Sequence, residues 1–150
     1  MKIRYTIVVL LLAVAFSCKN ETKHKNQQIS QTNEITVTDS LQLMLNKGKK
    51  WRVNPETQGG VEKMQSIISA FKKEASKDYI ALGKKLSKQT SYIIQNCNMV
   101  GPSHDQLHVV LVPMLDAIGN LKEAENSTKG AKALLKLEGL IQDYFNHFEL

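Results

Sequence analysis

Four side chains of the kinds that bind soft metal ions lie within residues 97–108. A thiolate and a thioether are suited to Cu(I), and a thiolate combined with imidazole is suited to zinc or copper. His104 and His108 are four residues apart, so on a helix they share one face at adjacent turns. The spacing predicts a Cu(I) or Zn(II) site in which the end of one helix meets the start of the next. The candidate ligands are Cys97, Met99, His104 and His108.

The same four residues also have ordinary structural interpretations. Cys97 continues the apolar face of its helix, and Met99 can fill a gap in a core. A histidine at a helix start is more often solvated or hydrogen-bonded than metal-bound. A second hypothesis therefore stays open, in which the chain is a non-catalytic helical adaptor that contacts a partner protein of the envelope through an exposed helix face or through Trp51.

Residues 104–108 read His-Asp-Gln-Leu-His, which is similar to the H-E-x-x-H motif of zinc proteases. Asp105 stands where that chemistry requires Glu, and its side chain is one methylene too short for the catalytic water. The sequence also shows no nucleophile with an adjacent base and no C-x-x-C-H motif for haem. We therefore expect a protein that is not an enzyme.

The first residues have the features of an export signal. Lys2 and Arg4 precede an apolar run over residues 7–16, which is shorter than the roughly 20 residues that a transmembrane helix needs. Residues 15–18, Ala-Phe-Ser-Cys, resemble a lipobox, with Ala15 where Leu is typical. We expect residues 1–17 to be a signal peptide and Cys18 to carry acyl chains such as palmitate. An ordinary secretory signal followed by an incidental cysteine is the alternative.

Residues 18–37 are rich in Asn, Gln, Thr and Lys and predict a flexible tether between the lipid and a domain over residues 38–150. Lys19 follows the cysteine in place of the Asp that often retains lipoproteins in the inner membrane. We therefore expect a location on the periplasmic face of the outer membrane, with the bilayer as a partner through the anchor.

The charge of the chain is mildly basic, with 20 Lys and Arg against 14 Asp and Glu and a formal net charge of +6. The lysines are spread along the sequence, without an arginine cluster and without interleaved aromatic residues. This distribution is not that of a nucleic-acid-binding protein.

The elements that position the candidate ligands are predicted to be helices. Apolar residues recur every three or four positions, and no stretch alternates as a strand does. Asn54-Pro55 begins one helix, a turn near Ser76 separates it from the next, and Ser103 with Gln106 has the form of a capping box for a third. A fourth helix follows residues 126–128.

Short connections between four amphipathic helices predict an all-α fold, an antiparallel up-down four-helix bundle. A short extra N-terminal helix is expected from Thr38 or Asp39, with Leu41, Met44 and Leu45 on its apolar side, until Gly48 ends it. Trp51 is expected to cover one end of the bundle.

Three stretches, residues 46–54, 78–83 and the C-x-M-x-G-x-x-H-D-x-L-H run of 97–108, resemble a group of small lipoproteins of the flavobacterial type from the Bacteroidota. The resemblance covers most of residues 41–150. It implies a helical domain in the cell envelope and no particular activity. It draws attention to Cys97, Met99, His104, Asp105 and His108.

Overall fold

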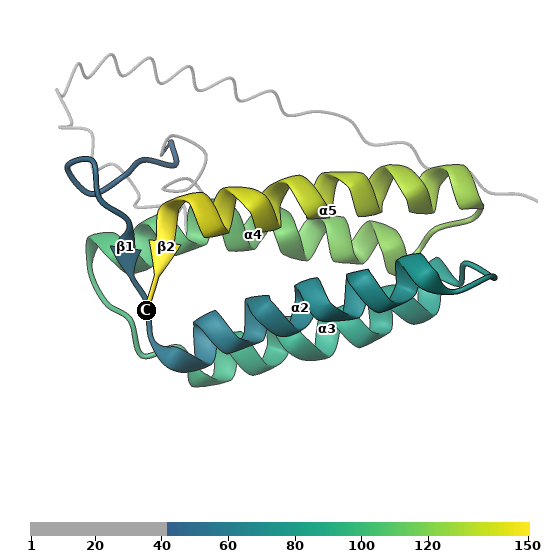
Figure 1. Cartoon of the computed structure of the whole chain (residues 1–150), viewed down its shortest axis with the longest axis horizontal. Helices are drawn as coiled ribbons and strands as arrows, with labels where there is room; N and C mark the ends of the chain where they lie inside the picture. Colours follow the sequence, from purple (N-terminus) through teal and green to yellow (C-terminus); the bar gives the residue numbers. More distant parts are fainter. Residues whose placement is uncertain (1–41) are drawn as a thin grey trace, which may run out of the picture. The chain divides into compact units, whose positions relative to one another are not determined.

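A computed structural model describes residues 42–150, most of which are helical (Figure 1). The all-α class is confirmed, and two short strands add to it. None of the helices in this part of the chain is long and apolar enough to cross a membrane. The predicted signal peptide, Cys18 and the tether lie outside the described residues. The elements are β1 (Trp51–Arg52), α2 (Pro55–Lys73), α3 (Tyr79–Asn96), α4 (Pro102–Lys122), α5 (Ser127–His147) and β2 (Phe148–Glu149).

Local capping signals set the helix boundaries. The turn expected near Ser76 is present between α2 and α3, and the Asp78 carboxylate accepts a hydrogen bond of 2.9 Å from the Ala81 N–H. At the start of α5 the Asn126 side chain accepts a bond of 2.9 Å from the Lys129 N–H. Each cap satisfies a backbone donor that the first helical turn leaves free.

The core is built from the apolar faces of all four helices, and helices that follow each other in sequence pack together. Its largest members are almost completely shielded from solvent. Phe148 of β2 stacks on Tyr144 of α5 with ring centroids 5.0 Å apart. The fully buried side chains include Val61, Met64, Leu82, Leu86, Ile93, Leu107, Val110, Met114, Leu121, Leu137, Tyr144 and Phe148.

Glycine allows two helices to approach closely near the start of α3. A Cβ atom on Gly83 would lie 2.8 Å from the backbone nitrogen of Lys122 and 3.0 Å from Leu121 Cβ. The beginning of α3 therefore lies directly against the end of α4. At the other end of α3, a Cβ on Gly60 of α2 would lie within 2.3 Å of the Ile93 side chain.

The expected N-terminal helix is not formed over the residues that the structure describes. Residues 42–45 are not helical, and Asn46 and Lys49 pair through backbone hydrogen bonds of 2.8 and 3.0 Å around Lys47 and Gly48. Both turn residues have positive φ, 52° and 83°. Met44, expected on the buried side of a helix, is 58% exposed. The positions before residue 42 lie outside the described part.

The close packing at Gly83 predicts that Gly83→Ala destabilises the domain by about 1–3 kcal/mol, because the added methyl group meets backbone rather than a flexible side chain. Gly139→Ala is the matched control, since nothing lies within 4 Å of its Cβ position in α5. There the better helix propensity of alanine should stabilise the domain by about 0.5–1 kcal/mol. Urea unfolding of both variants measures the difference, and a stabilising effect of both would contradict the packing.

Candidate functional site

The four predicted ligands lie on and around the connection between α3 and α4. Cys97 is the C-cap of α3, Met99 lies in the connection, and the two histidines lie in the first two turns of α4. Gly101 at the N-cap has a φ of 66°, a value that favours glycine, and Pro102 follows as the first residue of α4. This pair turns the chain sharply from one helix into the next.

The structure brings His104 and His108 into contact. Their ring centroids are 4.4 Å apart in an edge-to-face arrangement, with His104 partly buried and His108 exposed. Although much of the His108 surface is exposed, the partial burial of its ring lowers its pKa below 6.5, the neighbouring charge of His104 lowers it further, and the charge of Asp105 acts in the opposite direction. His108 is therefore neutral at neutral pH, which is the form that binds metal ions.

Cys97 and Met99 are half-buried and pack against the hydrophobic core. Within residues 42–150, no three His, Cys, Asp or Glu side chains are grouped so that they could hold a metal ion. Of the four predicted ligands, the structure thus joins the two histidines and places the two sulfur atoms against the core.

Gln106 has a role that the sequence did not indicate. The predicted capping box is wrong, since α4 begins at Pro102 with Gly101 as its N-cap and without a side-chain cap. Gln106 is instead buried, at 5% exposure. Its Oε1 accepts a bond of 2.7 Å from the Met44 N–H, and its Nε2 donates to the Gln42 carbonyl over 3.2 Å. The sequence contains one signal for this role, a Gln directly beside the buried stripe of α4. Such a Gln can be buried, and a buried amide needs hydrogen-bond partners.

Asn54 also does more than begin a helix. Its side chain makes no capping bond to α2. Its Nδ2 donates to the Asn96 carbonyl over 2.9 Å and to Glu56 Oε2 over 2.7 Å, and its Oδ1 accepts from the Thr57 hydroxyl over 2.5 Å. The start of α2 is therefore tied to the end of α3, directly before Cys97.

Trp51 packs against the core at this end of the domain, as predicted. Its indole N–H donates to the Met44 carbonyl over 2.5 Å, and its backbone pairs with Phe148 in the parallel β1–β2 pair. Trp51 therefore holds the residues before it as well as covering the core.

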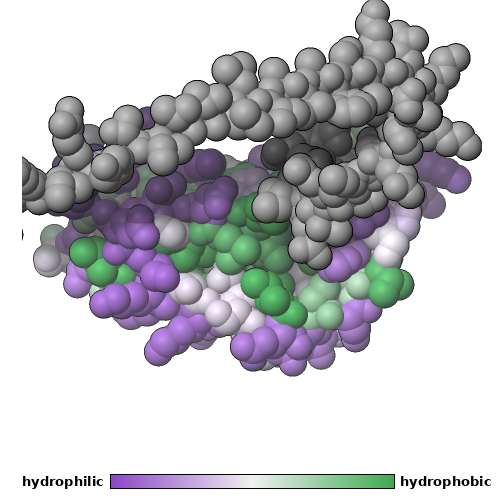
Figure 2. Space-filling view, turned by 180° about the vertical axis from the view of Figure 1, so that it is seen from behind, coloured by the Kyte–Doolittle hydropathy of each residue, from purple (hydrophilic) through white to green (hydrophobic). Residues whose placement is uncertain are grey.

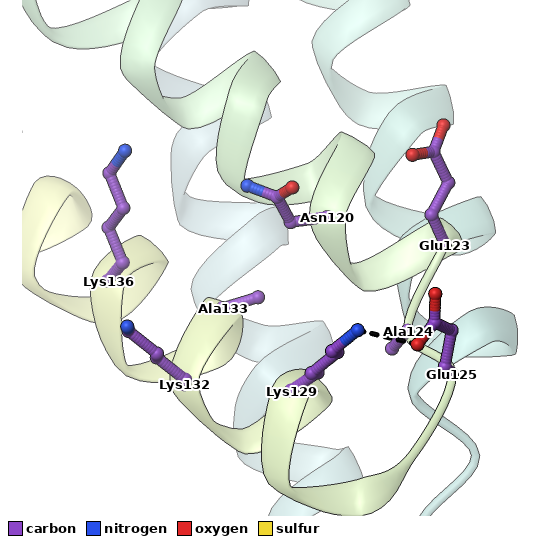
Figure 3. Close-up of a pocket in the computed structure, with 8 residues that line it drawn as sticks. All are labelled: Asn120, Glu123, Ala124, Glu125, Lys129, Lys132, Ala133 and Lys136. Carbon is purple, nitrogen blue, oxygen red and sulfur yellow. Dashed lines mark hydrogen bonds and ion pairs between the residues drawn. The ribbon is translucent and has the colours of Figure 1, made fainter.

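A separate cavity of about 560 Å³ lies between the end of α4 and the start of α5 (Figure 3). Lysines of α5 face acidic residues of the turn across it, and Lys129 pairs with Glu125 at 2.5 Å. The mixed charge does not select an anion or a cation, and none of the predicted ligands lines it. The lining residues are Asn120, Glu123, Ala124, Glu125, Lys129, Lys132, Ala133 and Lys136.

No protein-family model, no curated protein and no solved structure matches this chain. The similarity to Bacteroidota lipoproteins stays a prediction.

The hydrogen bonds of Gln106 predict that Gln106→Met frees residues 42–44 from α4. A methionine fills a similar volume but offers no amide, so the Met44 N–H exchanges with solvent faster and the domain loses about 1–3 kcal/mol. Gln95→Met, at an exposed position of α3, is the control. Hydrogen exchange of the Met44 amide measures the effect, and unchanged protection in Gln106→Met would contradict the assignment.

The environment of His108 predicts opposite shifts for two neighbouring variants. His104→Ala removes a charge that lowers the pKa of His108 and should raise it, whereas Asp105→Asn removes a charge that raises it and should lower it further. NMR titration of the His108 imidazole in the presence of a chelator measures its pKa in both variants. Changes of this pKa in the same direction would be inconsistent with this environment.

The lowered pKa of His108 also predicts how the stability of the domain changes with pH. As the pH falls, His108 is protonated in the unfolded chain before it is protonated in the folded domain. Its contribution to the free energy of unfolding is therefore fully present above about pH 6.5 and decreases below that pH. The wild-type domain should therefore lose more stability between pH 7.5 and pH 5 than His108→Gln does. Urea unfolding at the two pH values measures the difference, and an equal loss in both proteins would argue against a lowered pKa.

Proposed function

We propose that this chain is an envelope lipoprotein, not an enzyme, that binds a copper or zinc ion through His104 and His108. The observation that carries the metal part is the contact between the two imidazoles, 4.4 Å apart at their centroids. Two imidazoles at adjacent turns of one helix are a common way to hold zinc or copper. The lowered pKa of His108 favours binding, because little energy is spent on removing a proton.

The two histidines leave further coordination positions of the ion free. For Cu(I), the proposal assigns Cys97 and Met99 to them, since thiolate and thioether are soft ligands and both belong to the connection that leads into α4. Cys97 and Met99 are half-buried, so their side chains are partly accessible from solvent. Zn(II) binding depends on the histidines and Cu(I) binding on the sulfur atoms as well.

We also propose that the chain is cleaved after residue 17 and held by a lipid on Cys18 at the periplasmic face of the outer membrane. The support for the anchor is the N-terminal sequence. We further propose an antiparallel up-down arrangement of the four helices. The short connections support this arrangement, as does the contact of Gly83 near the start of α3 with Lys122 at the end of α4.

Calorimetric titration of Zn(II) and Cu(I) into the purified chain tests the metal part. His108→Ala should weaken Zn(II) binding by about tenfold or more, because loss of even a group that only orients a ligand typically costs about 10–100-fold in affinity. His147→Ala is the matched control, because this histidine is the last residue of α5, is hydrogen-bonded to the Asp143 carbonyl and is not one of the predicted ligands. Cys97→Ser should weaken Cu(I) more than Zn(II). Equal binding by the His108→Ala and His147→Ala variants would remove the proposal.

A second candidate, a helical adaptor for an envelope protein, is favoured by exposed apolar side chains on α3, α4 and their connection. Figure 2 shows hydrophobic residues gathered in a band on this face. Ile94 is 53% exposed, Val100 81% and Val112 40%. Apolar clusters of this kind often mark a protein contact. An adaptor complex would survive a chelator and be lost in Val112→Asp, whereas a metal-binding role predicts the reverse.

The anchor has its own test in the mass of the N-terminal peptide isolated from membranes. Cys18→Ser should abolish acylation and release the protein, and Cys97→Ser should leave both unchanged. An unacylated N-terminus at another residue in the wild-type protein would contradict the anchor without affecting the metal proposal.

A further inference from the structure

A basic hairpin, defined here as residues 46–52, contains the turn before β1 and β1 itself, at one end of the domain (Figure 1). The Asn46–Lys49 bridge closes it. Four cationic side chains fall within it, and all are exposed. They are Lys47, Lys49, Lys50 and Arg52.

These cations are not neutralised by ion pairs inside the described part of the chain. The ion pairs of residues 42–150 are Lys72–Glu138 and Lys129–Glu125, both away from the hairpin. Lys50 Nζ donates to the Phe145 carbonyl over 2.6 Å, an uncharged acceptor. One acid, Glu149, lies opposite Arg52 in the strand pair. The hairpin therefore carries a net positive charge.

Apolar side chains accompany the charges. Met44 is 58% exposed and Leu45 42%, directly before the hairpin. The Trp51 indole donates to the Met44 carbonyl, which holds this residue beside the basic turn. Lysine ammonium groups combined with a tryptophan and flexible apolar side chains suit the boundary between lipid headgroups and acyl chains.

We propose that the basic hairpin binds the anionic surface of a phospholipid bilayer. A protruding turn with several unpaired cations suits a surface that presents many phosphate groups. The described chain also begins at Gln42, so the segment that would lead to the anchor joins the domain beside the hairpin. That segment can reach at most about 80 Å when fully extended. In this respect the inference rests on the lipid anchor of the proposed function.

Trp51 provides a direct probe, because it is the single tryptophan of the chain. The experiment uses the full chain with Cys18→Ser, so that no acyl group holds the protein to the vesicle. Quenching of Trp51 fluorescence by brominated lipid is measured with vesicles of phosphatidylcholine alone and with vesicles that also contain phosphatidylglycerol. We expect quenching with the anionic vesicles only, and a decrease in it as salt is added.

Two double variants distinguish vesicle binding by the hairpin from vesicle binding by positive charge elsewhere on the surface. Lys47→Asn with Lys49→Gln should weaken binding to anionic vesicles by about tenfold, and Asn is chosen because it tolerates the positive φ of residue 47. Lys84→Gln with Lys88→Gln removes the same charge from the exposed side of α3 and should change binding less than about twofold.

Equal quenching with neutral and anionic vesicles, or equal weakening by both double variants, would overturn the proposal. The absence of Trp51 quenching with any vesicle would also overturn it and would favour an acidic protein as the partner of the hairpin. Circular dichroism of each variant verifies that the helices are retained. Whether Cys18 is acylated is determined separately, from the mass of the N-terminal peptide. A missing lipid anchor and a hairpin that does not bind the bilayer therefore give different results.

Discussion

The buried amide of Gln106 determines where the chain enters the helical domain. An amide at 5% exposure loses its hydrogen bonds to water, and the protein must replace them. The partners are the backbone of Gln42 and Met44, which are thereby held against α4. Met44 in turn accepts the bond from Trp51. Because Gln106 lies between His104 and His108 in sequence, the same interaction places the basic hairpin at the end of the domain that carries the histidines.

The two ends of the domain are built differently. Where α2 meets α3 and α4 meets α5, single side chains cap the helices locally, as Asp78 and Asn126 do. At the opposite end, Asn54 and Gln106 connect segments far apart in the chain. Every buried side-chain nitrogen and oxygen of the described residues has a hydrogen-bond partner. Three of the four buried polar residues of the described part, Asn54, Thr57 and Gln106, lie at the end that bears the candidate site.

The features of the fold that depend on interactions between neighbouring residues could be predicted from the sequence. The helical periodicity, the turn near Ser76 and the adjacency of the two histidines all depend on residues within a few positions of one another. The role of Gln106 depends on a bond to Met44, 62 residues away, which no local pattern contains; the same bond holds Met44 within residues 42–45, which are not helical. The strands β1 and β2 have two residues each, which is too short to show an alternation of apolar and polar residues. Whether Cys97 and Met99 share an ion with the histidines depends on tertiary geometry, so it stays a prediction.

The strand pair determines the order in which parts of the domain can fold. The hydrogen bond from Lys50 to the Phe145 carbonyl joins residues 95 positions apart, and β1 pairs with β2, which follows α5. Contacts of such long sequence separation carry a high loop-closure entropy and form late. The helices can condense before this pairing forms, but the tryptophan end stays open until β2 reaches β1. This end of the domain is therefore the last part of the fold to close.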